Sequence, residues 1–243
     1  MPKQSFQVTV EAIERLTPTV KVFRLRVAAD AGFEFVAGQY VMVDIPRDAG
    51  ILQKAYSIAS SPMQRDSIDL CITLVEGGYA STYFHRAVEI GTTMTIHEAQ
   101  GTFVDRGGDR ERLYVATGTG IAPIRSMIQA LYATGFDGPL WLFFGVRYED
   151  EILYQAEWRR LAAGHSRFRF LPTVSRPRAL NGTNKRPWTG DVGWVQDLLR
   201  AHLTDPANKE AYVCGVVPMV KAVKPLLIEL GVPRPQIHTE KYT

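Results

Sequence analysis

A glycine turn between an apolar segment and a helix-like segment constrains this chain more than any other feature. The turn spans residues 116–123, Ala-Thr-Gly-Thr-Gly-Ile-Ala-Pro. Residues 112–115 before it are short and mostly apolar, which predicts a buried strand, and residues 124–132 after it carry apolar side chains at helical spacing. Pro123 suits a first helical turn, where its missing N–H has no intrahelical acceptor. The stretch therefore predicts a strand, a tight turn and a helix.

Such a turn can bring backbone N–H groups to an anion at the positive end of a helix. A phosphate-bearing nucleotide is one interpretation, and a tight turn that needs glycine only for its backbone angles is the other. The G-x-G-x-x-G fingerprint is incomplete because Pro123 occupies the third glycine position. The turn by itself leaves both interpretations open.

Length and composition exclude several classes of protein. A chain of 243 residues fits one large or two small domains, and a net charge of +3 is too small to indicate nucleic-acid binding. No apolar run has the length of a membrane span, and the N-terminus lacks a signal-peptide core. The only cysteines, Cys71 and Cys214, exclude a disulfide framework and a four-cysteine metal site, and no histidine pair has metal-ligand spacing. We expect a cytoplasmic protein without a metal.

The first half of the chain alternates apolar and polar residues in short segments. Glycine and proline punctuate these segments, which predicts a closed or nearly closed antiparallel β-barrel with one helix near residues 81–86. The predicted strands are residues 6–10, 20–27, 40–45, 67–75 and 93–96.

Two stretches of this barrel carry candidate ligand groups. In residues 54–60 a tyrosine lies between a cation and a hydroxyl, so it could stack on a flat ring beside a bound phosphate. An edge strand with a packed tyrosine and a solvated lysine explains the same residues. In residues 77–81 two glycines precede a helix, which could form an anion-binding nest or an ordinary turn with Ser81 as helix N-cap.

The second half alternates strands with helices. This pattern predicts a doubly wound parallel sheet, whose ligands bind at the carboxyl ends of the strands. Four segments follow such strand ends: residues 118–123, 145–147, 175–176 and 214–219. The predicted later strands are residues 139–146, 168–174, 211–215 and 236–240. The predicted helices are 152–162, one within 192–203 around Val195, Leu198 and Leu199, and 218–230.

Taken in order, these motifs resemble the ferredoxin–NADP reductase superfamily, and most closely its bacterial ferredoxin/flavodoxin–NADP reductases. The resemblance covers essentially the whole chain. It implies an FAD-binding antiparallel β-barrel in residues 1–106 and an NADP-binding α/β domain in residues 107–243. The matching segments are Lys54-Ala55-Tyr56-Ser57 for Arg-x-Tyr-Ser, Gly78-Tyr79-Ala80-Ser81 for Gly-x-x-Ser, residues 118–123, and Cys214–Met219 for Cys-Gly-x-x-x-Met; residues 98–103 and 240–243 add weaker similarity.

The resemblance implies how FAD would be held. Tyr56 would pack on the isoalloxazine ring, and Ser57 would hydrogen-bond near its reactive nitrogen. Lys54 would meet the pyrophosphate, where the family usually has the bidentate fork of arginine. The rest of FAD would be held by Ala55, Ile72, Thr73 and Leu74 together with Gly78, Tyr79, Ala80 and Ser81, and Tyr242 is a candidate for covering the flavin.

On the nucleotide side, the resemblance places Thr119 and Gly120 against the pyrophosphate or nicotinamide. Cys214 would lie near the reactive nicotinamide carbon, and Glu240 would be a polar, proton-relaying carboxylate. With Ser57, these two make up the implied catalytic set. A small buried strand residue is the alternative interpretation of Cys214.

The choice between NADPH and NADH depends on what meets the ribose, since a 2′-phosphate needs cations. Ser175-Arg176 resembles the phosphate clamp of bacterial NADP-dependent members, and Lys221 and Arg147 add cations. The residues that follow carry further positive charge at Arg178, Lys185 and Arg186, so we expect NADPH; a solvated basic loop is the alternative.

The expected function is transfer of hydride between NADP(H) and FAD, with single electrons passing to or from a separate acidic ferredoxin or flavodoxin. We expect a monomer. Three alternatives remain: an NAD(P)H:flavin reductase, an electron-transfer flavin subunit of a larger oxygenase or oxidoreductase complex, and a nucleotide-binding module without redox activity. The Gly78–Ser81 segment favours tightly bound FAD over a diffusing flavin substrate.

Overall fold

The computed structural model describes residues 4–177 and 188–242. The chain divides into two compact units, one formed by Met1–Arg106 with Ala122–Phe136 and the other by Gly107–Ile121 with Asp137–Thr243. Arg178, Lys185, Arg186 and Thr243 lie outside the described residues. None of the helices within the described ranges is long and apolar enough to cross a membrane.

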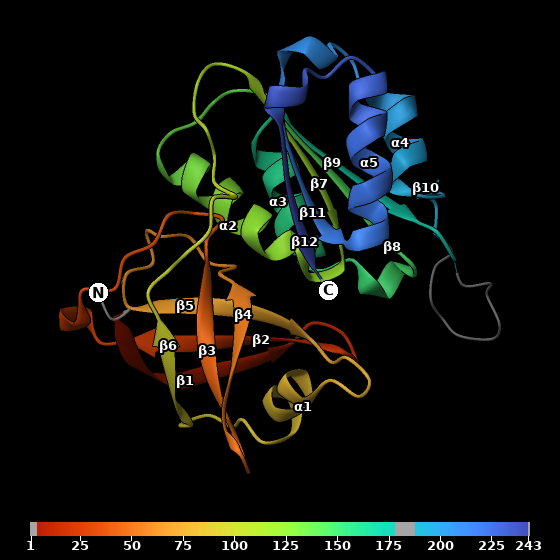
Figure 1. Cartoon of the computed structure of the whole chain (residues 1–243). Helices are drawn as coiled ribbons and strands as arrows, with labels where there is room; N and C mark the ends of the chain where they lie inside the picture. Colours follow the sequence, from red (N-terminus) through yellow and green to blue (C-terminus); the bar gives the residue numbers. More distant parts are fainter. Residues whose placement is uncertain (1–3, 178–187, 243) are drawn as a thin grey trace. The chain divides into compact units, whose positions relative to one another are not determined.

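The first unit contains a six-stranded antiparallel sheet in the order β4-β3-β6-β1-β2-β5 (Figure 1). An isolated bridge between Ile58 and Leu70 joins its two end strands, and Ala59 N–H donates to the Asp69 carbonyl at 2.8 Å. The sheet therefore curls into a nearly closed barrel, which confirms the prediction. Its strands are β1 Ser5–Arg15, β2 Val20–Val27, β3 Tyr40–Arg47, β4 Gly50–Ser57, β5 Ser67–Thr73 and β6 Thr93–His97.

Alternating side chains of these strands fill the barrel interior. Val8, Val10 and Leu25 are each at most 1% exposed, as the period-2 pattern requires. Helix α1 (Tyr79–Arg86) adds Phe84, whose ring meets those of Phe23 and Tyr56 edge-on at 5.1 Å between centroids. A short 3₁₀ turn, η1 (Ala29–Ala31), precedes β3, and helix α2 (Ile121–Ala133) also belongs to this unit apart from its first residue.

The second unit is a parallel sheet in the order β10-β9-β8-β7-β11-β12. Helices α4 and α5 cover one face, where Leu113, Val115 and Val213 are fully buried, and Trp158 of α3 packs on Phe168 and Phe170 of the other (Figure 1). The elements are β7 Glu111–Thr117, β8 Leu140–Val146, β9 Phe168–Val174, β10 Asp191–Val192, β11 Lys209–Val216, β12 Ile237–Tyr242, α3 Gln155–Gly164, α4 Val195–His202, α5 Val217–Glu229, and the 3₁₀ turns η2 Gly118–Gly120, η3 Glu149–Glu151, η4 Pro206–Asn208 and η5 Arg234–Gln236.

The ends of two predicted helical segments are defined by local contacts. Helix α4 begins at Val195, the first residue around which the helix was predicted, and the Asp197 carboxylate accepts from the Trp194 N–H at 2.9 Å. Val192, in the same segment, instead pairs with Val174 of β9. Helix α3 begins at Gln155, after Tyr154 takes a left-handed backbone conformation with φ 55°.

A buried ion pair lies at the amino ends of β7 and β11. The Lys209 ammonium is 2.6 Å from the Glu111 carboxylate, which also accepts from the Trp141 indole at 2.9 Å. The Lys209 side chain is 1% exposed and the Glu111 side chain 20% exposed. The lysine thus depends on this one carboxylate for charge compensation, with the Asp205 carbonyl as a further acceptor at 3.2 Å.

We predict that Glu111→Gln lowers the free energy of unfolding by about 2–3 kcal/mol, because it leaves a buried ammonium without a carboxylate. Lys209→Met removes the buried charge with a side chain of similar length, so its loss should be smaller, about 1 kcal/mol. Urea denaturation at neutral pH measures both. A larger loss for Lys209→Met than for Glu111→Gln would contradict the assignment.

Candidate functional site

The glycine turn packs directly against the neighbouring strand. Gly118 has φ 53°, a left-handed conformation that favours glycine. A Cβ on Gly120 would overlap the carbonyl oxygen and carbon of Cys214 in β11, so only glycine fits there. The structure therefore brings together Gly120 and Cys214, two residues that the sequence singled out separately.

The Cys-Gly-x-x-x-Met motif has a local physical basis in the same place. A Cβ on Gly215 would overlap the hydroxyl of Thr117, and it would lie 2.8 Å from the terminal methyl of Met219. Thr117 ends β7, and its buried hydroxyl has no hydrogen-bond partner among the described residues. A buried hydroxyl of this kind can accept or donate to a polar ligand atom.

Cys214, Glu240 and Tyr242 lie on one face of the sheet. Cys214 pairs with Glu240 and Val216 pairs with Tyr242 across the parallel strands β11 and β12. Burial raises the pKa of the Cys214 thiol, the Glu240 carboxylate raises it further, and a hydrogen bond from Tyr242 opposes them. Cys214 is therefore a neutral thiol at neutral pH, which suits contact with an uncharged ring better than nucleophilic attack.

The cation-bearing segments after β8 and β9 run side by side. The Ser175 N–H donates to the Val146 carbonyl at 2.9 Å, and the Arg176 N–H donates to the Arg147 carbonyl at 2.8 Å. Arg147 also pairs with Glu151, at 3.1 Å between the side chains, so its charge is partly compensated. Arg176 is exposed.

Lys221 lies apart from this pair of segments. It is an exposed residue of α5, which follows β11, and two strands separate β11 from β9 in the sheet. At about 4.8 Å per strand, the two strands are roughly 14 Å apart. The backbone therefore does not place Lys221 beside Arg176.

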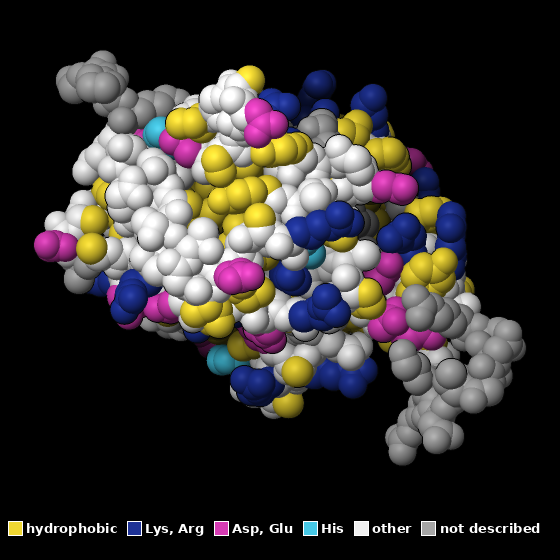
Figure 2. Space-filling view, turned by 90° about the horizontal axis from the view of Figure 1, so that it is seen from below, with side chains coloured by type: hydrophobic (Ala, Val, Ile, Leu, Met, Phe, Trp, Pro, Cys, Tyr) yellow, Lys and Arg dark blue, Asp and Glu magenta, His cyan; other side chains and the backbone are white. Residues whose placement is uncertain are grey.

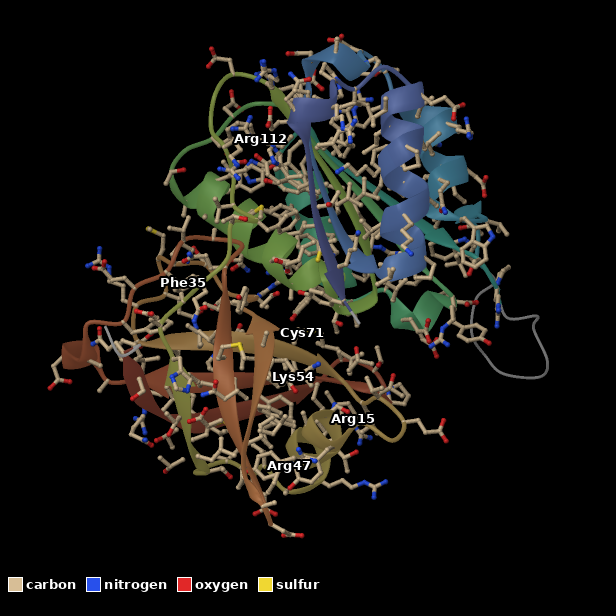
Figure 3. All side chains as sticks on the ribbon, viewed as in Figure 1. Arg15, Phe35, Arg47, Lys54, Cys71 and Arg112 are labelled. Atoms are coloured by element: carbon tan, nitrogen blue, oxygen red, sulfur yellow. The ribbon has the colours of Figure 1, made fainter. Side chains whose placement is uncertain are left out.

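In the first unit, Lys54 and Tyr56 lie two residues apart on β4 and so share a face. Lys54 is exposed (Figure 3), whereas Tyr56 is half-buried and its pKa is raised by burial. Ser57 is buried at the end of the strand. Since β4 is an end strand of the sheet with a packed tyrosine and an exposed lysine, the structure is compatible with both interpretations of this motif.

The Gly-x-x-Ser spacing has an intramolecular cause. The Ser81 hydroxyl accepts from the Val75 N–H at 3.0 Å and lies 3.1 Å from the Gly78 carbonyl. A Cβ on Gly78 would be only 2.9 Å from that hydroxyl. Gly78 rather than Ser81 is the N-cap of α1, so the N-cap interpretation of Ser81 is wrong. The first-turn N–H groups of α1 lack intrahelical acceptors, so an anion can bind them.

The remaining residues predicted to contact the flavin lie on β4, at the end of β5 and in the first turn of α1. The Ile72 carbonyl is 3.0 Å from the His85 ring, so α1 is tied to β5 by this contact. Thr73 ends β5 and Leu74 follows it, with the Leu74 N–H donating to the Thr19 carbonyl at 2.7 Å. Tyr79 donates its hydroxyl to the Pro46 carbonyl at 2.6 Å. Ala55 is exposed and Ala80 is buried.

Comparison with known proteins shows the family. Residues 7–104 match the oxidoreductase FAD-binding domain, and residues 114–225 match the oxidoreductase NAD-binding domain. Ferredoxin–NADP reductase B of Sorangium cellulosum is 38% identical, with 98% of each chain covered. The chain belongs to the ferredoxin–NADP reductase family.

Further comparisons support the fold. The phenol hydroxylase P5 protein of Acinetobacter pittii is 32% identical, and the match covers 98% of this chain but 66% of that protein. The crystal structure of a ferredoxin NADP+ reductase from Neisseria gonorrhoeae with bound FAD and NADP has a TM-score of 0.80 at 23% identity, with 98% of both chains covered. The resemblance inferred from the motifs and the two-part fold are thus confirmed.

The described residues fit both cofactors of this family. An exposed lysine and the first turn of α1 suit a diphosphate, Tyr56 offers a ring, and Thr117 offers a free hydroxyl beside Gly215. Thr117 lies in the 116–123 turn that the sequence singled out, directly before Gly118, but the motifs gave it no role. Within the described part of the chain, no three His, Cys, Asp or Glu side chains are arranged to hold a metal ion.

We predict different costs for alanine at the two turn glycines. Gly118→Ala should destabilise the protein by about 1–2 kcal/mol, because the left-handed backbone disfavours a Cβ but nothing lies within 4 Å of it. Gly120→Ala should cost about 3 kcal/mol, because β7 or β11 must move to admit the methyl group. Equal losses in chemical denaturation would argue against the close approach of Gly120 to Cys214.

Proposed function

We propose that this chain is an FAD-dependent reductase that passes hydride between NADP(H) and FAD and exchanges single electrons with a ferredoxin or flavodoxin. The packing of Gly120 against Cys214, with the buried Thr117 hydroxyl left without a hydrogen-bond partner among the described residues, supports this most directly. It gathers an uncharged thiol, a hydroxyl and backbone groups at the carboxyl end of the sheet, where such folds bind nucleotides.

We assign the two cofactors to the two halves of the chain, FAD to residues 1–106 and the pyridine nucleotide to residues 107–243. FAD supplies the hydride chemistry and the one-electron steps when bound. On the flavin side, Tyr56 packs on the ring, Ser57 hydrogen-bonds to it, and Lys54 with the first turn of α1 binds the diphosphate. The exposure of Lys54 and the half-buried ring of Tyr56 on the same face of β4 support these roles.

On the nucleotide side, Thr119 and Gly120 bind the pyrophosphate, and Cys214 contacts the nicotinamide as a neutral thiol. Glu240 lies across from Cys214 in the sheet, where it can hold a proton near the nicotinamide. Tyr242 hydrogen-bonds to Cys214, which suits a positioning role for that tyrosine rather than one as a free cover. Ser175, Arg176 and Arg147 bind the 2′-phosphate; Lys221 contributes only at longer range.

A separate acidic one-electron carrier is the proposed partner. Exposed Arg15, Arg47 and Lys54 lie around α1 (Figure 3), and Figure 2 shows Lys and Arg side chains interspersed with Asp and Glu on the face seen from below. Opposite charge speeds the encounter of such carriers with a reductase. The similarity to the phenol hydroxylase P5 protein supports a second candidate, the reductase of an oxygenase system.

A panel of acceptors tests the function. Purified protein reconstituted with FAD should oxidise NADPH with ferredoxin and flavodoxin at rates far above those with free FMN or riboflavin. Faster turnover with free flavins would favour a flavin reductase instead. Failure to take up FAD at all would overturn the redox assignment.

Arg176→Ala tests the nucleotide assignment. Loss of one charge-assisted contact to a phosphate weakens binding by about 1.5–3 kcal/mol, so KM for NADPH should rise about 10- to 100-fold. KM for NADH should change less than 2-fold, because NADH has no 2′-phosphate. Lys221→Ala is the matched control, with a smaller effect on NADPH. Equal effects of Arg176→Ala on both nucleotides would contradict the clamp.

A further inference from the structure

Arg125 of α2 reaches two partners at the seam where the barrel closes. One of its guanidinium nitrogens donates to the Ala59 carbonyl at 2.8 Å and lies 3.4 Å from the Asp69 carboxylate. The Asp69 side chain is 3% exposed and that of Arg125 is 13% exposed. The contact is therefore largely shielded from solvent, where charged hydrogen bonds are strong.

The neighbouring residue of α2 continues the same contact. The Ser126 hydroxyl donates to the Ser60 carbonyl at 2.6 Å, and the Ser60 hydroxyl accepts from the Asp69 N–H at 3.0 Å. Together with the hydrogen bond from Ala59 N–H to the Asp69 carbonyl, these contacts hold residues 59–60 between α2 and β5. Residues 59–60 directly follow the Tyr56-Ser57 end of β4 and Ile58.

Asp69 also has a second cation. Arg24 forms a two-pronged pair with its carboxylate, at 2.8 and 3.2 Å, from a side chain that is 43% exposed. Arg24 makes the shorter contact, so it can compensate most of the Asp69 charge. The contact that distinguishes Arg125 is the one to the Ala59 carbonyl.

We propose that Arg125 is a positioning residue for the flavin. By fixing the Ala59 carbonyl, it fixes the end of β4, and so sets the place of Tyr56 and Ser57 against the isoalloxazine ring. This inference rests on the proposed function.

Three variants separate positioning from charge compensation. Arg125→Met keeps an unbranched side chain but removes both contacts, Arg125→Lys keeps a charged donor without the planar fork of the guanidinium, and Arg24→Met removes only an Asp69 partner. FAD affinity and the visible circular dichroism of the bound flavin are measured for each, with unfolding of the FAD-free protein as the stability control.

Arg125→Met should weaken FAD binding at least about 10-fold and change the flavin dichroism, as expected for loss of a buried charge-assisted contact. Arg125→Lys should restore part of both, and Arg24→Met should change FAD affinity less than 2-fold. If Arg125→Met does not fold, the FAD affinity and flavin dichroism of Arg125→Lys are compared with those of Arg24→Met instead.

Equal weakening by Arg24→Met and the Arg125 variants would overturn the proposal, because it would show that only the Asp69 charge matters. Unchanged FAD affinity and dichroism in the Arg125 variants would overturn it as well. In both cases the wild-type protein still binds FAD and uses NADPH. Failure of the wild type to bind FAD would instead defeat the proposed function itself.

Discussion

The contact of Gly120 with the Cys214 carbonyl is the constraint on which the nucleotide half depends. It sets the distance between the turn after β7 and the end of β11, and a methyl group would not fit between them. Gly215 makes a similar close contact, because a Cβ on it would overlap the Thr117 hydroxyl. The two motifs are thus halves of one packing arrangement, and the ligand-binding groups at this edge of the sheet are held in place by the fold itself.

The flavin half uses a similar device. Gly78 leaves room for the Ser81 hydroxyl to hold the turn that begins at Val75, and this directs the first turn of α1. The serine is therefore occupied by the nearby backbone of Val75 and Gly78, and it shapes the start of the helix rather than offering a free hydroxyl. At the barrel seam, Arg125 and Ser126 likewise hold a short segment in place, by donating hydrogen bonds to the carbonyls of residues 59–60.

Much of the fold was predictable because the spacing of apolar residues in a strand reflects directly which side chains face the core. Strands β2 and β9 begin and end at the predicted residues, since one alternates cleanly and the other lies between clear turn signals. Strand β10 was not predictable, because Val192 has the apolar character of either element and only its pairing with Val174 makes it a strand residue. The order of strands in each sheet likewise depends on contacts distant in sequence.

The sequence by itself determined the family, the two-part fold and the candidate ligand-binding residues, because glycine and strand-end motifs have fixed local geometry. Only the tertiary structure showed that Gly120, Cys214 and Thr117 come together, that Tyr242 hydrogen-bonds to Cys214, and that two strands separate β11, which precedes Lys221, from β9, which precedes Arg176. It also revealed Arg125 and Asp69, which belong to no motif. These residues come into contact only when β7 pairs with β11 and when the barrel closes. Both contacts join residues far apart in the sequence, so no local sequence pattern predicts them.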